Sequence, residues 1–322
     1  MIIQSPESAM PEPYKTYVRQ RSETIAKFLS KIVGEQNVQL CPRAITPEEV
    51  IFHEPSSVIY GAVVRVAEDG LKSVLYRDNF TSKKHGVTTN EITRARNYAL
   101  GQLSQGNRIR VKDATESDGK GQKTIESLEE LDDAIYSISA HREKQIVIMP
   151  HLENITERIS VGRIALGKIG DFEYFGREEV QHHDDSQVYG GTTLGLFPSN
   201  LVDGDRVLEA LDISPDIALL GVEAIKQYQS IATRAHRVSV DVIQGFTDNG
   251  SKITDVVDIT PRVGGTTPAE ILAIREVIAG DDAVCFAKTQ LIYAPKESPK
   301  SGVNFIDTQS LVINADVLGV MR

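Results

Sequence analysis

A β-hairpin that leads straight into a helix is the feature that most constrains the fold of this chain. The alternating runs RVSVDVIQGF (237–246) and KITDVVDITPRV (252–263) are joined by a turn containing Asn-Gly, a strong hairpin signal. In the following RVGGTTPAEILAI, Thr267 can cap a helix, Pro268 can open it and Glu270 can complete a capping box. The sequence therefore predicts two antiparallel strands followed closely by a helix.

The second strand of this hairpin carries a row of polar side chains. Alternate residues of a strand share a face, so Asp258, Thr260 and Arg262 are expected to line up. Asp241 on the first strand folds back near Val257 or Asp258, depending on the register. Converging carboxylates suit Mg²⁺, a hard cation that usually shares its oxygen ligands with phosphates. The alternative interpretation is a pair of solvated strand acids.

A glycine pair after the hairpin predicts an anion site. Gly264 and Gly265 leave the first amides of the helix open to a carboxylate or phosphate, and Arg262 beside them can act as a bidentate clamp. An ordinary turn from strand to helix needs one glycine at most. The double glycine next to arginine therefore favours a functional role.

A second glycine turn lies in VKDATESDGKGQ (111–122). Gly119 and Gly121 let the backbone approach an anion, and Lys112 and Lys120 can neutralise phosphate oxygens. Alone, such a loop fits an unliganded charged turn as well. The hairpin and the glycine pair tip the interpretation towards phosphate.

Helical and strand-like patterns alternate along much of the chain. Helices are predicted at 16–34, 91–105, 127–139 and 215–234, the third with a capping box from Ser127 to Glu130. Strands are predicted at 37–40, 57–66, 107–112, 145–151, 159–167 and 172–181. With 322 residues, the chain is expected to form about two α/β (α+β) domains.

Charge and cysteine content exclude several classes of protein. A net charge of −10 disfavours nonspecific binding to nucleic acid or to an anionic membrane. Cys41 and Cys285 have no metal-binding spacing and indicate buried thiols in a reducing compartment. Neither a secretory leader nor an apolar run of membrane length is recognisable. We therefore expect a cytoplasmic protein without nucleic-acid or membrane partners.

The HHDD cluster at 182–185 is the main feature that points elsewhere, to a zinc hydrolase. Adjacent histidines in a strand point to opposite faces, and no converging motif accompanies them. A polar turn is the favoured interpretation. Gly190 and Gly191, which follow, predict a segment that can move over a bound substrate.

The order of these motifs resembles the ATP-grasp superfamily from about residue 81 to about residue 274. That order is Lys112, the glycine loop, a strand break at MPHLE, then SVGRI, and then SVDVIQG followed by VVDITPRVGGTTPAE. Three longer segments, IMPHLENITERISVGRIALG, YFGREEVQHHDDSQVYGGTTL and TPRVGGTTPAEI, resemble an uncharacterised bacterial ATP-grasp-like family.

This resemblance implies an ATP-grasp fold, in which two α+β subdomains sandwich the nucleotide. It implies a small N-terminal α/β domain at 1–82 and an ATP-grasp domain at 83–322. Within the latter, a lid subdomain is expected at about 108–150 and a core subdomain at about 151–322.

The resemblance also implies roles for individual residues. The nucleotide phosphates would meet Lys112 and either Lys83 or Lys84. The flexible cover over the triphosphate would be Asp118, Gly119, Lys120, Gly121 and Gln122. The hinge with Met149, His151 and Leu152 would contact the adenine edge. Asp241, Asp258 and Thr260 would hold Mg²⁺, and Arg262 would steady the transferred phosphoryl group.

Three departures from the ATP-grasp pattern affect the expected activity. Met149 replaces the usual hinge glutamate, unless Glu153 or Glu157 substitutes as the ribose partner. Asp258 stands for a glutamate and Thr260 for an asparagine, which weakens the case for two tightly held magnesium ions.

The implied function is an ATP- and Mg-dependent ligase that activates a small-molecule or peptide carboxylate as an acyl phosphate for attack by an amine or similar nucleophile. The alternative is a noncatalytic ATP-binding sensor or scaffold. The sequence leaves open whether the chain forms a homodimer with a second copy of itself.

Overall fold

The computed structural model describes most of the chain. The described residues are 2–4, 14–33, 39–41, 85–113, 122–139, 146–183, 186–200, 204–231, 237–260, 263–280, 284–293, 295, 299, 301–308 and 310–321. The strand predicted at 57–66 therefore lies outside them.

The chain divides into two compact units. Unit 1 comprises residues 1–64, 159–241 and 260–322, and unit 2 comprises residues 65–158 and 242–259. The boundaries fall inside three strands, β7 (Glu153–Ala165), β10 (Arg237–Phe246) and β11 (Lys252–Thr260). The domain boundaries expected from the sequence stay predictions.

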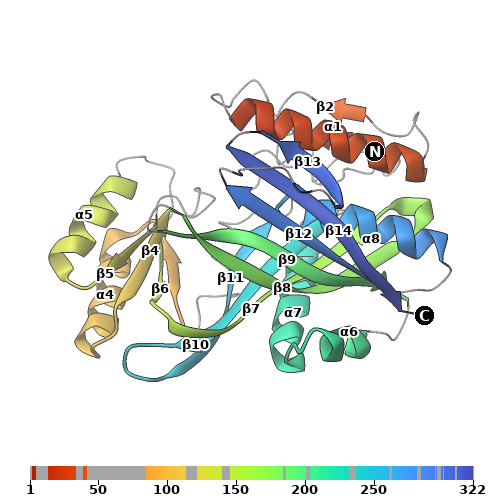
Figure 1. The fold of residues 1–322 in the computed structure, drawn as a ribbon. Helices are drawn as coiled ribbons and strands as arrows, with labels where there is room; N and C mark the ends of the chain where they lie inside the picture. The colour runs from red at the N-terminus through yellow and green to blue at the C-terminus, as the bar shows by residue number, and fades with distance from the viewer. Residues whose placement is uncertain are drawn as a thin grey trace. The chain divides into compact units, whose positions relative to one another are not determined.

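Unit 2 is built on a four-stranded antiparallel sheet. The strand order is β3 (Val87–Thr89), β6 (Ile146–Pro150), β4 (Ile109–Asp113) and β5 (Gln122–Ile125). Helices α4 (Ile92–Ser104) and α5 (Leu128–Ser139) lie beside this sheet (Figure 1). Their buried residues Ala95, Ala99, Leu131 and Ala134 pack with alternate strand residues, including Ile109 and Val111. The helices therefore cover one face, and the residues between, such as Arg110 and Lys112, point to the other.

The larger sheet has eight strands in the order β11-β10-β7-β8-β9-β12-β14-β13. The strands not yet bounded are β8 (Asp171–His183), β9 (Ser186–Pro198), β12 (Val284–Tyr293), β13 (Val303–Asp307) and β14 (Leu311–Met321). Antiparallel pairing links β7 to β8, β8 to β9, and β12 to both β9 and β14.

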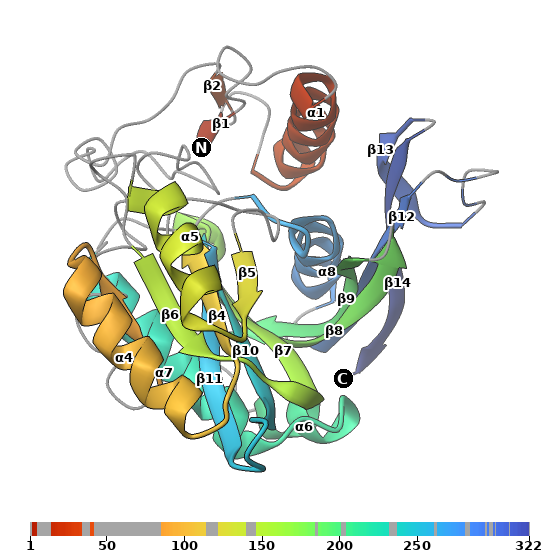
Figure 2. The ribbon, with the colours of Figure 1, turned by 90° about the vertical axis from the view of Figure 1, so that its left-hand side faces the viewer.

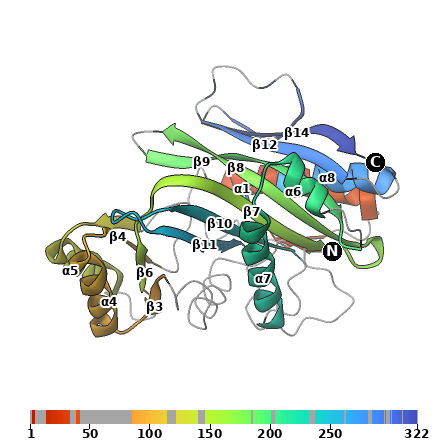
Figure 3. The ribbon, with the colours of Figure 1, turned by 90° about the horizontal axis from the view of Figure 1, so that it is seen from below.

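Helices of unit 1 pack against these strands. Helix α8 (Thr267–Ala279) contacts β9, β12 and β14, and α1 (Tyr14–Val33) contacts α8 and β13 (Figure 2). Their apolar residues join Tyr174, Leu194 and Phe305 in one buried cluster. Helices α6 (Gly204–Ala210) and α7 (Pro215–Ile231) follow β9 (Figure 3). A short parallel pair, β1 (Ile2–Gln4) and β2 (Gln39–Cys41), and the 3₁₀ turn η3 (Gly167–Ile169) complete the described elements.

The structure corrects several local expectations. Strand β8 extends through His182 and His183, which pair with Gln187 and Ser186, so these two histidines are strand residues rather than a turn. Asp184 and Asp185 lie outside the described residues.

Gly191 also has a different role from the one expected. It pairs with both Glu179 and Gln290 inside the sheet, at a φ of 143°. A Cβ atom there would lie 2.0 Å from the Thr289 carbonyl oxygen. This glycine therefore serves close strand packing, where a segment that moves over substrate was expected.

None of the described helices is long and apolar enough to cross a membrane.

Candidate functional site

Lys112 belongs to a row of residues that crosses the four-stranded sheet of unit 2. Its cross-strand neighbours are Gln122 on β5 and Val147 on β6, and Val147 is in turn paired with Thr88 on β3. The row lies on the face opposite α4 and α5. The Thr88 hydroxyl is buried and has no hydrogen-bond partner among the described residues.

Strand β11 meets this row at Lys112. The Lys112 ammonium donates to the Val257 carbonyl oxygen at 3.5 Å, and both residues belong to unit 2. Asp255 lies two residues before Val257 on the same strand and is only 4% exposed. The phosphate lysine expected from the sequence therefore lies beside a buried carboxyl group that the sequence analysis did not single out.

The Asp255 carboxyl is buried with little compensation. Burial raises its pKa to about 8, opposed by the nearby positive charge of Lys112 and by the Val256 amide, which donates to the carboxylate. Its Oδ2 atom has no hydrogen-bond partner among the described residues. The Tyr98 hydroxyl, which donates to the His85 carbonyl at 2.7 Å, has a raised pKa, first through burial and then through Asp255.

The predicted hinge lies at the end of β6. Met149 is 6% exposed, and the His151 amide donates to the Arg108 carbonyl at 2.9 Å, so that amide is already engaged. The His151 Nδ1 atom and the Glu157 Oε2 atom are buried without a hydrogen-bond partner among the described residues. Burial, and then the charges of Arg110 and Arg108, lower the pKa of His151. Leu152 is half-buried.

Arg108 ties the hinge to the hairpin turn. Its guanidinium donates to Asp248 at 2.8 Å and also contacts Glu153, while its backbone amide donates to Asp248 at 2.7 Å. The Asn249 amide donates to the side chain of Asn107 at 3.1 Å. These contacts fix the hairpin turn against the start of β4 within unit 2.

The three predicted magnesium ligands belong to different units. Asp258 is in unit 2, where its Oδ1 accepts from the Ile259 amide at 2.9 Å. Asp241 and Thr260 are in unit 1. The described residues contain no group of three or more His, Cys, Asp or Glu side chains arranged to hold a metal ion. The magnesium site stays a prediction.

The glycine pair precedes a helix start that is built differently from the predicted capping box. The N-cap is Thr266, without a side-chain cap, and α8 begins at Thr267. The Gly264 amide donates to the Thr267 hydroxyl at 2.9 Å and is therefore not open as expected. A Cβ on Gly265 would lie 2.3 Å from the Tyr189 ring.

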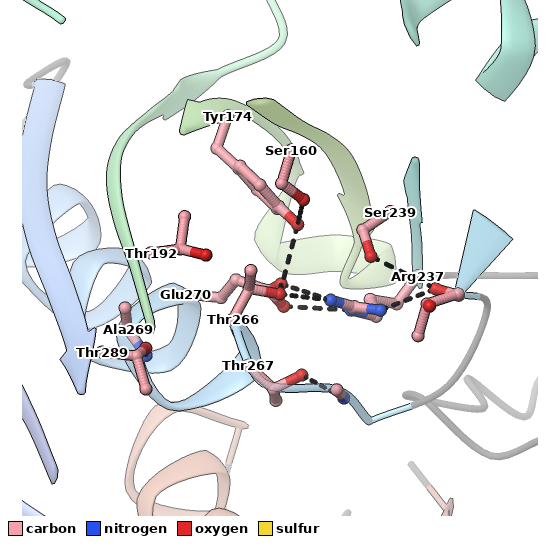
Figure 4. A network of polar contacts seen from close by, with 12 residues as sticks. Ser160, Tyr174, Thr192, Arg237, Ser239, Thr266, Thr267, Ala269, Glu270 and Thr289 are labelled. Carbon is pink, nitrogen blue, oxygen red and sulfur yellow. Dashed lines mark hydrogen bonds and ion pairs between the residues drawn. The ribbon is translucent and has the colours of Figure 1, made fainter. Parts of the chain in front are cut away.

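Glu270 belongs to a closed buried network (Figure 4). Its carboxylate accepts from Arg237 at 2.5 and 3.1 Å, and neither side chain is exposed. The Thr266 hydroxyl donates to Glu270 at 2.6 Å and accepts from Arg237 and from Tyr174. Arg237 also donates to the Thr260 carbonyl at 2.7 Å. This network holds the end of β11 to the start of α8 in unit 1.

Several predicted residues lie outside the described part of the chain. These are Lys83, Lys84, Asp118, Gly119, Lys120, Gly121 and Arg262. Gln122 is described and opens β5 opposite Lys112. A depression of about 650 Å³ lies in unit 1 beside Phe172, Pro198 and Val277, and none of the predicted site residues lines it.

Solved structures show which fold the chain has. N5-carboxyaminoimidazole synthetase from Staphylococcus aureus has a TM-score of 0.51 at 13% identity, with 98% of this chain and 92% of that chain covered. The same synthetase complexed with ADP gives 0.49 at 12% identity, covering 98% and 92%. D-alanine--D-alanine ligase from Bacillus anthracis gives 0.44 at 11% identity, covering 82% and 86%. The chain has the ATP-grasp fold, as the sequence predicted.

A family model then gives the particular family. Residues 67–310 match the family described as "Protein of unknown function (DUF3182)", and the chain belongs to that family. The expected resemblance to an uncharacterised ATP-grasp-like family is thus confirmed. A search of curated proteins gave no match.

Proposed function

We propose that this chain is an ATP-dependent ligase that binds the triphosphate at Lys112. The ATP-grasp fold supports this proposal, and one observation carries it. Lys112 lies on the face of its sheet opposite α4 and α5, beside the Asp255 Oδ2 atom, and the Thr88 hydroxyl lies in the same cross-strand row. Neither of these two buried atoms has a hydrogen-bond partner among the described residues. Buried polar atoms normally have partners, so this surface fits a polar ligand or its bound water.

The residues predicted from the sequence would meet the groups that ATP presents. Lys112, together with Lys83 or Lys84, would neutralise the phosphates. Residues 118–122 would cover them, and Met149, His151 and Leu152 would border the base. Glu157, whose Oε2 is buried and unpartnered among the described residues, would accept from the ribose hydroxyls.

Asp241, Asp258 and Thr260 would hold Mg²⁺, because hard cations take carboxylate and hydroxyl oxygens. When bound, the ion would neutralise phosphate charge. Gly264 and Gly265, with Arg262, would position the substrate or the transferred group. Arg262 and Lys112 would act by charge stabilisation, so no side-chain nucleophile is required.

The reaction would proceed in two steps. A carboxylate oxygen of a small molecule or peptide attacks the γ-phosphorus, forming an acyl phosphate and releasing ADP. An amine or similar nucleophile then attacks the acyl carbon, and inorganic phosphate leaves with the C–O bond electrons. Such an enzyme would act in the cytoplasm, on a small-molecule or peptide substrate.

A noncatalytic ATP sensor or scaffold is the second candidate. Met149 favours it, because an apolar side chain only 6% exposed stands where the ATP-grasp pattern has a glutamate. Thr260 in place of asparagine points the same way. Binding without turnover would identify this case.

The test of nucleotide binding is Lys112→Ala, measured by calorimetry with Mg-ATP. A hydrogen bond to a charged group contributes about 1.5–3 kcal/mol, so we expect affinity to fall about 10- to 100-fold. Lys123→Ala is the matched control, because Lys123 is exposed on neighbouring β5 and lies opposite Val111, on the helix-covered face. Equal affinity of Lys112→Ala and wild type would refute the assignment.

Turnover is tested separately, by ADP release with pools of amino acids and small peptides. Asp258→Asn should retain most nucleotide binding and lose metal-dependent release. Nucleotide-induced thermal stabilisation without ADP release favours the sensor, whereas stabilisation by zinc alone would revive the hydrolase interpretation of the HHDD cluster.

A further inference from the structure

A depression of about 650 Å³ lies in unit 1, where β8 begins and where β9 and α8 end. Asp171 and Phe172 open β8, Pro198 closes β9, and Val277 and Ile278 belong to the last turn of α8. Pockets for small molecules typically have volumes of about 300–1,000 Å³, so this depression is large enough for one. The chemistry of its walls indicates which kind of molecule it would accept.

One part of the depression is apolar. Phe172 and Val277 are each 3% exposed and belong to the buried cluster that α8 shares with the sheet, so their positions are fixed by packing. Ile278, the next residue of α8, is 42% exposed. A ligand that covers Ile278 would remove apolar surface from water, which favours binding.

Negative charge comes from two sources in the depression. Asp171 is the only charged residue among the described residues that line it, and its side chain is 43% exposed. Its Oδ2 atom accepts from Arg163 at 3.1 Å, whereas Oδ1 has no partner among the described residues. The second source is the end of α8, because the last carbonyl groups of a helix lack helical partners and carry partial negative charge.

Ser199 adds a hydroxyl group beside Asp171. The Ser199 amide donates to the Asp171 carbonyl oxygen at 2.9 Å, which holds the two residues together. The Ser199 Oγ atom is buried and has no hydrogen-bond partner among the described residues. Buried hydroxyl groups normally have a partner, and rotation about a single bond can redirect this one. The hydroxyl is therefore a second polar group that a ligand can engage.

We propose that this depression binds a small organic amine. The ammonium group of the ligand donates to Asp171 and Ser199, and its apolar body covers Phe172, Val277 and Ile278. The charge of the site selects this class, because an anionic ligand would meet both the carboxylate and the negative end of α8.

The amine site is separate from the site proposed for ATP and its substrate. A helix rises about 1.5 Å per residue, so Ile278 lies about 16 Å along α8 from Thr267 and the glycine turn before it. None of the residues assigned to ATP lines the depression. Amine binding is therefore expected to be independent of nucleotide binding.

The experiment measures thermal shift and calorimetry on the full chain with three probes. Phenethylamine and hexylamine are cations at neutral pH, with an aromatic and an aliphatic body. The third probe, 3-phenylpropionate, has a similar aromatic body and the opposite charge. Ionic strength is held constant with sodium chloride, so that screening is equal in all samples.

Two variants change the site, and each has a matched control in unit 1. Asp171→Asn removes the charge, and its control is Asp212→Asn, because Asp212 is also paired with an arginine, Arg177, at 3.4 Å but does not line the depression. Ile278→Ala removes apolar surface, and its control is Leu219→Ala, at a residue of α7 that is 54% exposed.

We expect both amines to stabilise the wild-type chain and 3-phenylpropionate to give no shift. Asp171→Asn should lower the affinity for phenethylamine about 10-fold, as loss of a hydrogen bond to a charged group would. Ile278→Ala should lower it about 5-fold through the lost apolar contact. Asp212→Asn and Leu219→Ala should bind as wild type does. Because Ile278 is exposed, its variant still decides the result if Asp171→Asn does not fold.

Four results would overturn the proposal. These are no shift with either amine, an equal shift with 3-phenylpropionate, amine affinity unchanged in both site variants, and equal losses in the site variants and their controls. The series is repeated with saturating Mg-ATP. A missing ATP shift would count against the ligase proposal and would leave the amine result readable on its own.

Discussion

Two polar regions of this molecule satisfy their buried charges in different ways. Around Arg237 in unit 1, the guanidinium, the Glu270 carboxylate and the Thr266 hydroxyl bond to one another, and both charged side chains are fully buried. In unit 2, by contrast, Arg110 and Asp255 Oδ2 have no hydrogen-bond partner among the described residues. The first arrangement is what a structural clamp requires. The second is what a ligand site requires before its ligand arrives.

The largest effect should come from breaking the closed network. Arg237→Met leaves the Glu270 carboxylate buried and uncompensated, so we expect a loss of about 3–5 kcal/mol in the free energy of unfolding, measured in denaturant. The double variant Arg237→Met/Glu270→Leu should recover much of this loss, because neither charge remains buried. A single variant as stable as wild type would show that the pair is not a clamp.

A smaller, pH-dependent effect should come from Asp255. Its folded-state pKa of about 8 lies above the ordinary value of 3.8, so the folded chain keeps a proton that the unfolded chain loses. Stability should therefore fall as pH rises from about 4 to about 8, by up to about 1.4 kcal/mol per pH unit from this group. Lys112 and Tyr98 are the titratable groups whose charges couple to it.

Asp255→Asn removes this slope. Its midpoint of thermal unfolding should match wild type at about pH 3, where the Asp255 carboxyl is protonated in both the folded and the unfolded chain, and exceed it at pH 9 by an amount corresponding to a few kcal/mol. Parallel pH profiles for the two proteins would mean that the Asp255 carboxyl is compensated in the folded chain.

The smallest effect on stability should come from replacing either of two buried threonines. The hydroxyl of one has a hydrogen-bond partner, and the hydroxyl of the other has none among the described residues. Thr88 has a buried hydroxyl without a partner among the described residues, whereas the Thr192 hydroxyl is 2.6 Å from that of Tyr189. Thr88→Val should change stability by less than about 1 kcal/mol or raise it, and Thr192→Val should lower it by about 1–3 kcal/mol. Denaturant midpoints give both values, and equal losses would erase the distinction between the regions.

Elements with a strong local signal were predictable from the sequence. The first strand of the hairpin runs from Arg237 to Phe246 as predicted, because alternation and Asn-Gly agree there. β5 was not predicted, since the polar QKTI has no apolar period. β12, β13 and β14 were not predicted either, because their position depends on non-local pairing, such as that of β12 with β9.

The candidate site divides in the same way. Lys112 was predictable because it ends a strand before a glycine loop. Asp255 and Arg110 were not recognised, since an isolated charge in an alternating strand resembles a solvated residue. In KITDVVDIT, Asp255 alternates with Ile253, Val257 and Ile259, and a carboxyl group on an apolar face is the signal that was available. Glu270 was predicted to cap a helix. Its ion pair with Arg237 depends on tertiary packing, which the sequence pattern does not show.

The turn at Gly264 and Gly265 has a consequence for how fast this backbone moves. A pair of glycines suggests a loose joint, yet one amide is bonded to Thr267 and the other residue is overlaid by the Tyr189 ring. Opening this turn would require separating contacts made by α8 and β9. In heavy water, the backbone amide proton of Gly264 should therefore exchange as slowly as the amide protons of helix α8, and much more slowly than those of an ordinary surface loop.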